Sequence, residues 1–273
     1  MTELLEYLAH PRYEVLPLDG IEERVVGHVP RDVKVTVTAS PARGLDATLA
    51  VCEGLARHGY SVVPHVSARL VRDRAHVEDI VARLTEAGIR DVFVPAGDAK
   101  EPGEFTDAAS LLRVLDRAFP DVGITGYPES HHLISDEDTI AAMFEKAPLA
   151  SYIVSQICFD PGTIATWVDR VRDRGTDLPI WIGLPGIVDN RRLLRISMKI
   201  GLGESARFLR ANQAWLRRLI TRTFTPDPLI RRLEPLYRDA RANIGGFHLY
   251  TFNEVERTER WRQRAIERLR GAA

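Results

Sequence analysis

Polar residues interrupt or end several apolar segments, where a charged or amide side chain is costly unless it forms hydrogen bonds. Glu14 lies inside the run 13–16. It either faces outward on a short strand or acts as a general acid whose pKa is raised by partial burial. Asp98 follows Gly97 after the run 91–95, and it either caps the next segment or accepts hydrogen bonds from a ligand. Gln156 ends the run 152–156. Its amide either binds strand backbone or both donates to and accepts from the edge of a heterocycle.

Other polar residues lie at or near the ends of further apolar runs: Thr38, His65, Tyr127, His131, Tyr250 and Asn253. His131 and His132 are adjacent, which is not the spacing of a structural zinc site, and no cysteine cluster accompanies them. We therefore expect no metal. The chain has neither the GxGxxG pattern of dinucleotide-binding folds nor a P-loop, so no motif of this kind identifies a cofactor.

Eight β-rich runs alternate with helical patterns and would position these residues. The runs are 13–16, 33–38, 60–65, 91–95, 122–126, 152–156, 180–184 and 246–250. Most are apolar on both faces, as strands of a buried parallel sheet are. Helical patterns lie at 45–59, 77–87, 111–119 and 164–174, and a longer helical stretch covers 190–200, 204–223 and 228–242.

This alternation predicts one α/β domain over residues 1–273, a (β/α)8 TIM barrel with an extra helical insertion before the last strand. Barrels of this class carry their active sites at the carboxyl ends of the strands. The polar residues that end the runs are therefore expected to meet at one end of the barrel.

Composition excludes several classes of protein. The chain has 273 residues, of which 45% are hydrophobic and 27% charged, so it is neither a largely disordered chain nor a disulfide scaffold. The formal net charge is −1, which gives no reason to expect a nucleic-acid partner. The segment 191–241 nevertheless holds thirteen basic and four acidic residues. It is either a solvated helical surface or a rim that attracts an anionic substrate or cofactor.

The two cysteines, Cys52 and Cys158, lie in apolar surroundings and are expected to be free thiols. The first residues lack the basic and apolar regions of a signal peptide, and no apolar run is long enough to span a membrane. We expect a cytoplasmic protein without membrane contact. The oligomeric state stays open.

Seven segments, in chain order, resemble motifs of the methylenetetrahydrofolate reductases. They are 13–15, 35–38, 64–67, 97–98, 126–131, 155–160 and 247–253. The segments 126–131 (Gly-Tyr-Pro-Glu-Ser-His) and 247–253 (Phe-His-Leu-Tyr-Thr-Phe-Asn) are especially similar. Each match is weak alone, but seven in the right order span nearly the whole chain. The resemblance is to the catalytic barrel of the family.

The resemblance implies a function and assigns residues to it. The family reduces 5,10-methylenetetrahydrofolate to 5-methyltetrahydrofolate with electrons from NADH or NADPH, usually through bound FAD. Glu14 would be the acid that opens the folate ring to an iminium ion, and Asp98 would hold the pterin and favour that cation. Gln156, Tyr250, Asn253 and Arg191 would bind the folate substrate. Thr38, His65, Gly97, Tyr127 and His131 would line the cofactor groove.

The chain departs from the family pattern mainly where FAD is held. Ala96 replaces an arginine before Gly97, Arg191 replaces an aromatic residue, and Glu254 replaces an arginine after Asn253. Ala141, Phe144 and Glu145 align with the asparagine and the basic pair that grip the FAD phosphates, and Lys146 would replace a basic residue only if the register slips by one. These changes make FAD doubtful.

We therefore favour the hypothesis that NADH or NADPH passes its hydride directly to the folate iminium. A hydride transfer of two electrons to an iminium needs no intermediate carrier. A conventional FAD-dependent reductase is the main alternative. A folate-binding relative without catalysis, and an unrelated barrel enzyme with a phosphate site after strands seven and eight, are the others.

Overall fold

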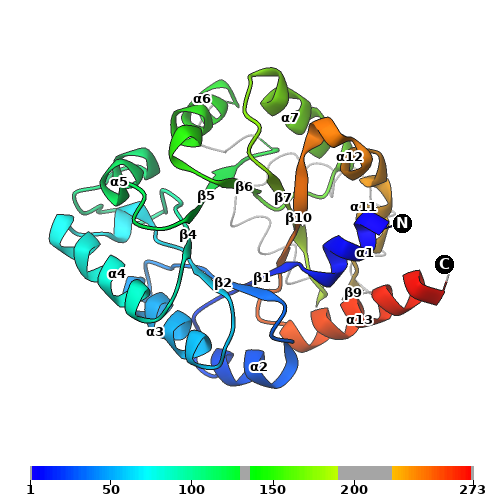
Figure 1. The fold of residues 1–273 in the computed structure, drawn as a ribbon, viewed down its shortest axis with the longest axis horizontal. Helices are drawn as coiled ribbons and strands as arrows, with labels where there is room; N and C mark the ends of the chain where they lie inside the picture. Colours follow the sequence, from blue (N-terminus) through cyan, green and yellow to red (C-terminus); the bar gives the residue numbers. More distant parts are fainter. Residues whose placement is uncertain (1, 130–135, 190–222, 272–273) are drawn as a thin grey trace.

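The computed structural model describes residues 2–129, 136–189 and 223–271. Eight parallel strands form its centre (Figure 1). They are β1 (Arg12–Val15), β2 (Lys34–Val37), β3 (Val62–Pro64), β4 (Asp91–Phe93), β5 (Asp121–Gly126), β6 (Tyr152–Ser155), β7 (Ile180–Pro185) and β10 (Ile244–Tyr250). All eight expected strands are present, and their order is β3-β2-β1-β10-β7-β6-β5-β4. A parallel bridge between His65 and Phe93 joins β3 to β4. The chain thus forms the predicted (β/α)8 barrel.

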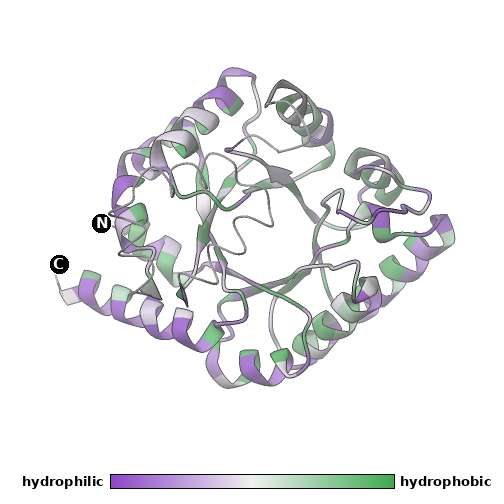
Figure 2. Ribbon diagram, turned by 180° about the vertical axis from the view of Figure 1, so that it is seen from behind, coloured by the Kyte–Doolittle hydropathy of each residue, from purple (hydrophilic) through white to green (hydrophobic). Residues whose placement is uncertain are grey.

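Helices surround this ring (Figure 1). They are α1 (Thr2–Ala9), α2 (Ile21–His28), α3 (Gly44–Arg57), α4 (Arg74–Glu86), α5 (Ala108–Leu115), α6 (Asp136–Lys146), α7 (Pro161–Asp173), α11 (Asp227–Arg232), α12 (Glu234–Arg238) and α13 (Val255–Gly271). Helix α3 buries Leu45, Leu49, Cys52 and Leu55, which share one helical face. The helices in Figure 2 accordingly carry both hydrophilic and hydrophobic stretches. No described helix is both long and apolar enough to cross a membrane.

Local sequence explains where several helices begin. Asp73, Asp107 and Asp160 precede α4, α5 and α7, and each carboxylate accepts a hydrogen bond from the backbone N–H three residues later. Such caps satisfy donors that the first helical turn leaves unpaired. They fix the ends of three connections that leave the carboxyl ends of β3, β4 and β6.

The structure differs from the expected helices in two places. The pattern 111–119 predicted a helix ending before Pro120, but α5 ends at Leu115 because Asp116 and Arg117 take positive φ values of 33° and 61°. The stretch 228–242 is broken into α11, α12 and a short 3-10 turn. The segments expected at 190–200 and 204–222 lie outside the described residues. Two short strands, β8 (Val188–Asp189) and β9 (Thr223–Phe224), pair across that gap.

A buried ionic group fills the amino-terminal part of the barrel interior. Asp91 on β4 accepts hydrogen bonds from Lys34 Nζ at 2.8 Å and from the Tyr152 hydroxyl at 2.7 Å. The guanidinium of Arg12 lies 3.6 Å from Asp91 and is sandwiched between the rings of Tyr152 and Trp181, at 3.9 and 4.2 Å from their centroids. These contacts pack charged and aromatic side chains into the amino-terminal end of the barrel.

Helix α13 is tied to the outer side of β1. The Tyr13 hydroxyl donates to Glu259 at 2.8 Å, and Arg262 donates to both carboxylate oxygens of Glu259 at 2.8 Å. Arg262 also binds the carbonyl oxygens of Leu8 and Ala9, so one buried cluster joins α1, β1 and α13. This cluster holds the strand that carries Glu14.

Candidate active site

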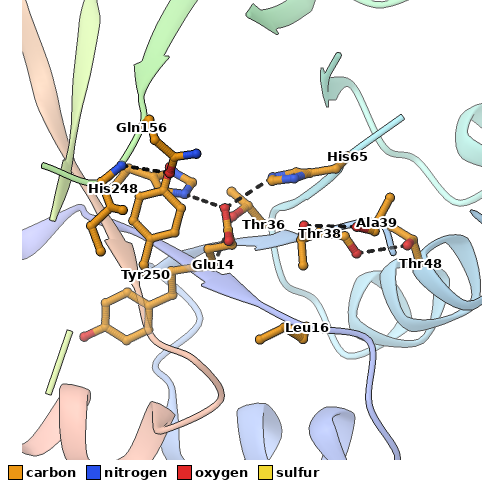
Figure 3. Close-up of polar contacts among 12 residues, drawn as sticks. Glu14, Leu16, Thr36, Thr38, Ala39, Thr48, His65, Gln156, His248 and Tyr250 are labelled. Atoms are coloured by element: carbon orange, nitrogen blue, oxygen red, sulfur yellow. Dashed lines mark hydrogen bonds and ion pairs between the residues drawn. The ribbon is translucent and has the colours of Figure 1, made fainter. Parts of the chain in front are cut away.

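Glu14 points into the barrel near the carboxyl end of β1, between two histidines. His248 on β10 places its Nε2 atom 3.1 Å from Glu14 Oε2, and His65, directly after β3, places its Nε2 atom 3.8 Å from the same oxygen (Figure 3). The Glu14 side chain is 16% exposed, whereas both histidines are buried. Strand register explains the grouping, because Glu14 lies opposite Tyr250 on β10 and opposite Thr36 on β2.

Burial decides the protonation of this group. It raises the pKa of Glu14 to about 7, an effect that the nearby His65 partly offsets. Burial lowers the pKa of His65 to about 4 and that of His248 to about 3, and the charge of Arg12 adds to the second shift. At neutral pH both imidazoles are therefore neutral, and Glu14 can hold a proton near neutral pH. A carboxyl group in this state can act as a general acid.

Gln156 and Tyr250 lie beside this group, at the ends of β6 and β10. Gln156 Oε1 accepts a hydrogen bond from the Ile157 N–H at 2.9 Å, and the Tyr250 hydroxyl donates to the Ser155 carbonyl at 3.1 Å. The Tyr250 ring also packs edge-on against His248, with the centroids 4.9 Å apart. The described residues form no hydrogen bond with the amide nitrogen of Gln156, which leaves this donor for a ligand.

Asp98 is exposed on the loop after β4. Arg69 holds this loop from the side, because its guanidinium donates to the carbonyl oxygens of Ala99 at 2.6 Å, Lys100 at 3.1 Å and Thr106 at 3.3 Å. The loop that Arg69 holds thus carries Asp98 at the protein surface, after the carboxyl end of β4.

Gly97 is needed for this loop. Its φ is +87°, and a Cβ atom there would lie 1.9 Å from Ser67 Oγ. If the chain binds folate as the family resemblance implies, Gly97→Ala should displace Asp98 and weaken that binding about tenfold, a loss of roughly 1.4 kcal/mol. Titration of the protein with tetrahydrofolate checks this. Gly88→Ala is the control, because Gly88 also has a positive φ, of +70°, but a Cβ atom there would meet nothing within 4 Å, and the residue lies after α4. Equal affinity in both variants would contradict the prediction.

Two further predicted residues have well-defined backbone contacts. Asn253 is buried with a φ of +64°, and its amide accepts from the Leu16 N–H at 2.7 Å and donates to the Leu16 carbonyl at 3.1 Å. It therefore holds the chain just after β1, and its predicted contact with substrate stays a prediction. Thr38 is half-buried after β2 and donates to the Ala39 carbonyl at 3.4 Å.

With this geometry known, comparison with other proteins gives the family. The family model for methylenetetrahydrofolate reductase matches residues 17–204, which is more than half of the chain. The chain belongs to the methylenetetrahydrofolate reductase family. The matched range includes His65, Asp98 and Gln156, whereas Glu14 and His248 lie outside it.

Two curated relatives are similar to part of this chain, and one solved structure shares its fold. Methylenetetrahydrofolate reductase 1 of Schizosaccharomyces pombe is 28% identical over 123 residues, and methylenetetrahydrofolate reductase 2 of Saccharomyces cerevisiae is 24% identical over 127 residues. These matches cover 40% and 41% of this chain but only 20% and 21% of the yeast proteins. An uncharacterized protein from Clostridium thermocellum, described as binding two copies of 5-methyl-5,6,7,8-tetrahydrofolic acid, shares the fold. Its TM-score is 0.62 at 12% identity, over 97% of this chain and 98% of that one.

Helix α6 occupies the stretch that the family resemblance aligned with the FAD-phosphate contacts. Ala141 and Glu145 are exposed, and Phe144 packs against the core. Glu145 forms an ion pair with Arg113 of α5. Lys146 is buried, with its Nζ atom 3.4 Å from Thr125 Oγ1, and burial lowers its pKa to about 8. Lys146 is the one basic residue of α6, so this helix presents no exposed cation to a diphosphate.

The remaining reductase-motif residues are described only in part. Tyr127 is half-buried after β5. His131, predicted to line the cofactor groove, and Arg191, predicted to bind substrate, lie outside the described residues. Within the described part of the chain, no group of three or more histidine, cysteine, aspartate or glutamate side chains is placed to hold a metal ion.

His248 is a site residue that the sequence did not predict. Its signal is present, because 248 and 250 share one face of the strand expected at 246–250, and Tyr250 is among the predicted site residues. Arg12 was missed for another reason. It precedes the apolar run at 13–16, and only the barrel shows that it lies inside, next to His248 in the strand register.

Proposed function

We propose that this chain reduces 5,10-methylenetetrahydrofolate to 5-methyltetrahydrofolate, with NADH or NADPH as a direct hydride donor and without flavin. The observation that carries the proposal is the Glu14 carboxyl group, which lies at the carboxyl end of a barrel strand with its pKa raised to about 7. Membership in the reductase family supports the reaction. The folate bound by the structural neighbour from Clostridium thermocellum supports the ligand class.

The proposed reaction uses one proton and one hydride. Glu14 gives its proton to N10 of the folate while the bond between N10 and the methylene carbon breaks, which leaves an iminium ion at N5. Asp98 and Gln156 bind the pterin edge, and the carboxylate of Asp98 favours the cation. The nicotinamide then transfers its hydride to the methylene carbon, which becomes the methyl group of the product.

The absence of exposed cations on α6 supports the part of the proposal that concerns flavin. A diphosphate is normally held by arginine or lysine side chains or by backbone N–H groups, and an arginine gives the strongest contact. Glu145 is an anion at the aligned surface, and the buried Lys146 contacts Thr125. The described part of α6 therefore does not fit the diphosphate of FAD, whereas reduction of an iminium by a nicotinamide needs no flavin.

The deciding experiment is anaerobic oxidation of NADH by flavin-free protein with 5,10-methylenetetrahydrofolate, repeated with NADPH and with added FAD. We expect 5-methyltetrahydrofolate to form without FAD, at a rate that FAD does not raise. Turnover that appears only with FAD would favour the conventional flavoenzyme. Tetrahydrofolate binding without turnover under every condition would favour a folate-binding protein without catalysis.

The pKa of Glu14 predicts the pH dependence of this activity. Because the acid must be protonated, kcat should be highest below pH 7 and should fall as pH rises through about 7. The slope above the midpoint should approach one tenfold loss per pH unit. Steady-state rates at saturating substrate between pH 5.5 and about 9 check this. A kcat that rises across this range would contradict the role of Glu14 as the acid.

A further inference from the structure

The two oxygens of the Glu14 carboxyl group have different surroundings. Oε2 lies 3.1 Å from His248 Nε2 and 3.8 Å from His65 Nε2, and only the first distance is a hydrogen bond (Figure 3). Oε1 receives no hydrogen bond from any residue that the structure describes. One oxygen is thus held by His248, and the other has no hydrogen-bond partner among the described residues.

His248 is held rigidly and without charge. Its side chain is 2% exposed, and the Tyr250 ring packs edge-on against it. Arg12 is its neighbour in the strand register, and the Arg12 guanidinium is fixed between two aromatic rings. That permanent positive charge opposes a second proton on the imidazole and adds to the effect of burial.

The surroundings of the neutral ring favour one tautomer. His248 Nδ1 is buried and finds no hydrogen-bond partner among the described residues. A proton on Nδ1 would be a buried, unpaired donor close to a cation, and Nε2 could then bind Glu14 only as the acceptor of a proton on Oε2. A proton on Nε2 is instead donated to Glu14 Oε2. An oxygen that accepts this bond is the worse place for the carboxyl proton.

We propose that His248 is a positioning residue for Glu14, which donates its Nε2–H to Oε2 and so places the transferable proton on Oε1. The inference rests on the proposed function, in which Glu14 is the acid. The proton on Oε1 passes to N10 of the folate as the ring bond breaks, Glu14 becomes a carboxylate, and His248 keeps its own proton throughout. The other ionisable groups that face this carboxyl group are His65 after β3 and Tyr250 on β10, and Arg12 lies beside His248 in the strand register.

Infrared spectroscopy tests the assigned atom without using activity. The carbonyl stretch of protonated Glu14 is isolated by subtracting the spectrum of Glu14→Gln at a pH below 7. In the wild type, Oε2 is the carbonyl oxygen and accepts from His248, which lowers the stretching frequency. We expect His248→Leu to raise this frequency and His248→Gln, which keeps an N–H donor, to restore it. His76→Leu is the control, since it removes another buried histidine, in α4. An unchanged frequency in His248→Leu would overturn the proposal.

Kinetics and nitrogen NMR complete the test. In His248→Leu, loss of the N–H donor should raise the pKa of Glu14 and move the descending limb of the pH profile of kcat to higher pH. It should also lower kcat on the order of tenfold, with KM nearly unchanged. His248→Gln should recover most of the rate. If His248→Leu does not fold, the NMR of isotope-labelled histidine in the wild type reports the tautomer directly, and a proton on Nδ1 would refute the assignment.

The outcomes separate the two proposals. An unaltered infrared band in an active reductase refutes the role of His248 alone. The expected shift of the band in a protein that shows no turnover with either nicotinamide refutes the reductase and keeps the contact.

Discussion

Replacing Glu14 with glutamine is expected to lower kcat by about 10²–10⁴-fold while tetrahydrofolate still binds with nearly the same affinity. Glutamine has the same shape and accepts the hydrogen bond from His248, but it has no proton to give to N10. The loss should therefore appear in the chemical step and not in folate binding. Steady-state kinetics and a binding titration on the same preparation measure the two effects separately.

The matched control for this variant is Glu256→Gln. Glu256 is also a glutamate in an ion pair, with Arg260, but it lies on the outer surface of α13. Its replacement should leave kcat and folate binding unchanged. A Glu14→Gln protein with wild-type turnover would show that the acid is another group. A variant that loses folate binding as well would mean that the carboxyl group holds substrate in its ground state.

The same variant should be more stable than the wild type at high pH. The pKa of Glu14 is raised in the folded state from 4.5 to about 7, so its contribution to stability is complete below about pH 4.5 and is lost as pH rises through 7. Ionised Glu14 thus destabilises the native state by roughly 1–3 kcal/mol at pH 8, and glutamine removes this penalty. Urea unfolding of the wild type and of Glu14→Gln at pH 5 and pH 8 measures this penalty. If the difference in the free energy of unfolding between the two proteins does not grow with pH, the raised pKa is contradicted.

The largest effect on stability is expected from Asp91→Leu. Asp91 is buried and accepts from Lys34 and Tyr152 beside the buried Arg12 guanidinium. Its removal leaves a buried cation and a buried hydroxyl group without their acceptor, which should cost about 3–5 kcal/mol. Urea unfolding measures the loss. Asp46→Asn is the control, because Asp46 is 78% exposed in its ion pair with Arg83 and should change stability by about 0–1 kcal/mol.

A second variant separates electrostatics from packing at this site. Combining Asp91→Leu with Arg12→Met removes both buried charges and replaces them with apolar side chains of similar volume. We expect the double variant to recover at least half of the stability that the single variant loses. If both variants are equally unstable, the loss comes from packing around Tyr152 and Trp181 and not from an uncompensated charge.

The barrel could be predicted from the sequence alone. Strands buried on both faces need apolar residues at nearly every position, so the eight runs were visible without a structure. Glu14 and Gln156 could be chosen as candidate site residues, because a polar side chain within or at the end of such an apolar run is costly unless it forms hydrogen bonds. Capping residues such as Asp107 could also have been read from sequence, but the early end of α5 depends on two left-handed residues that no local pattern required.

The neighbours of these residues became known only from the folded barrel. His248 lies 234 positions from Glu14, and a parallel ladder brings them within 3.1 Å because β1 pairs with β10. The alternation of side chains along a strand predicts which face each side chain occupies, but it does not predict which strand lies next to it. The contact of buried Lys146 with Thr125 and the hydrogen bonds of buried Asn253 with Leu16 likewise depend on the fold. Protonation depends on such neighbours and on access of water, so the pKa of the acid is a property of the folded barrel and not of its sequence motif.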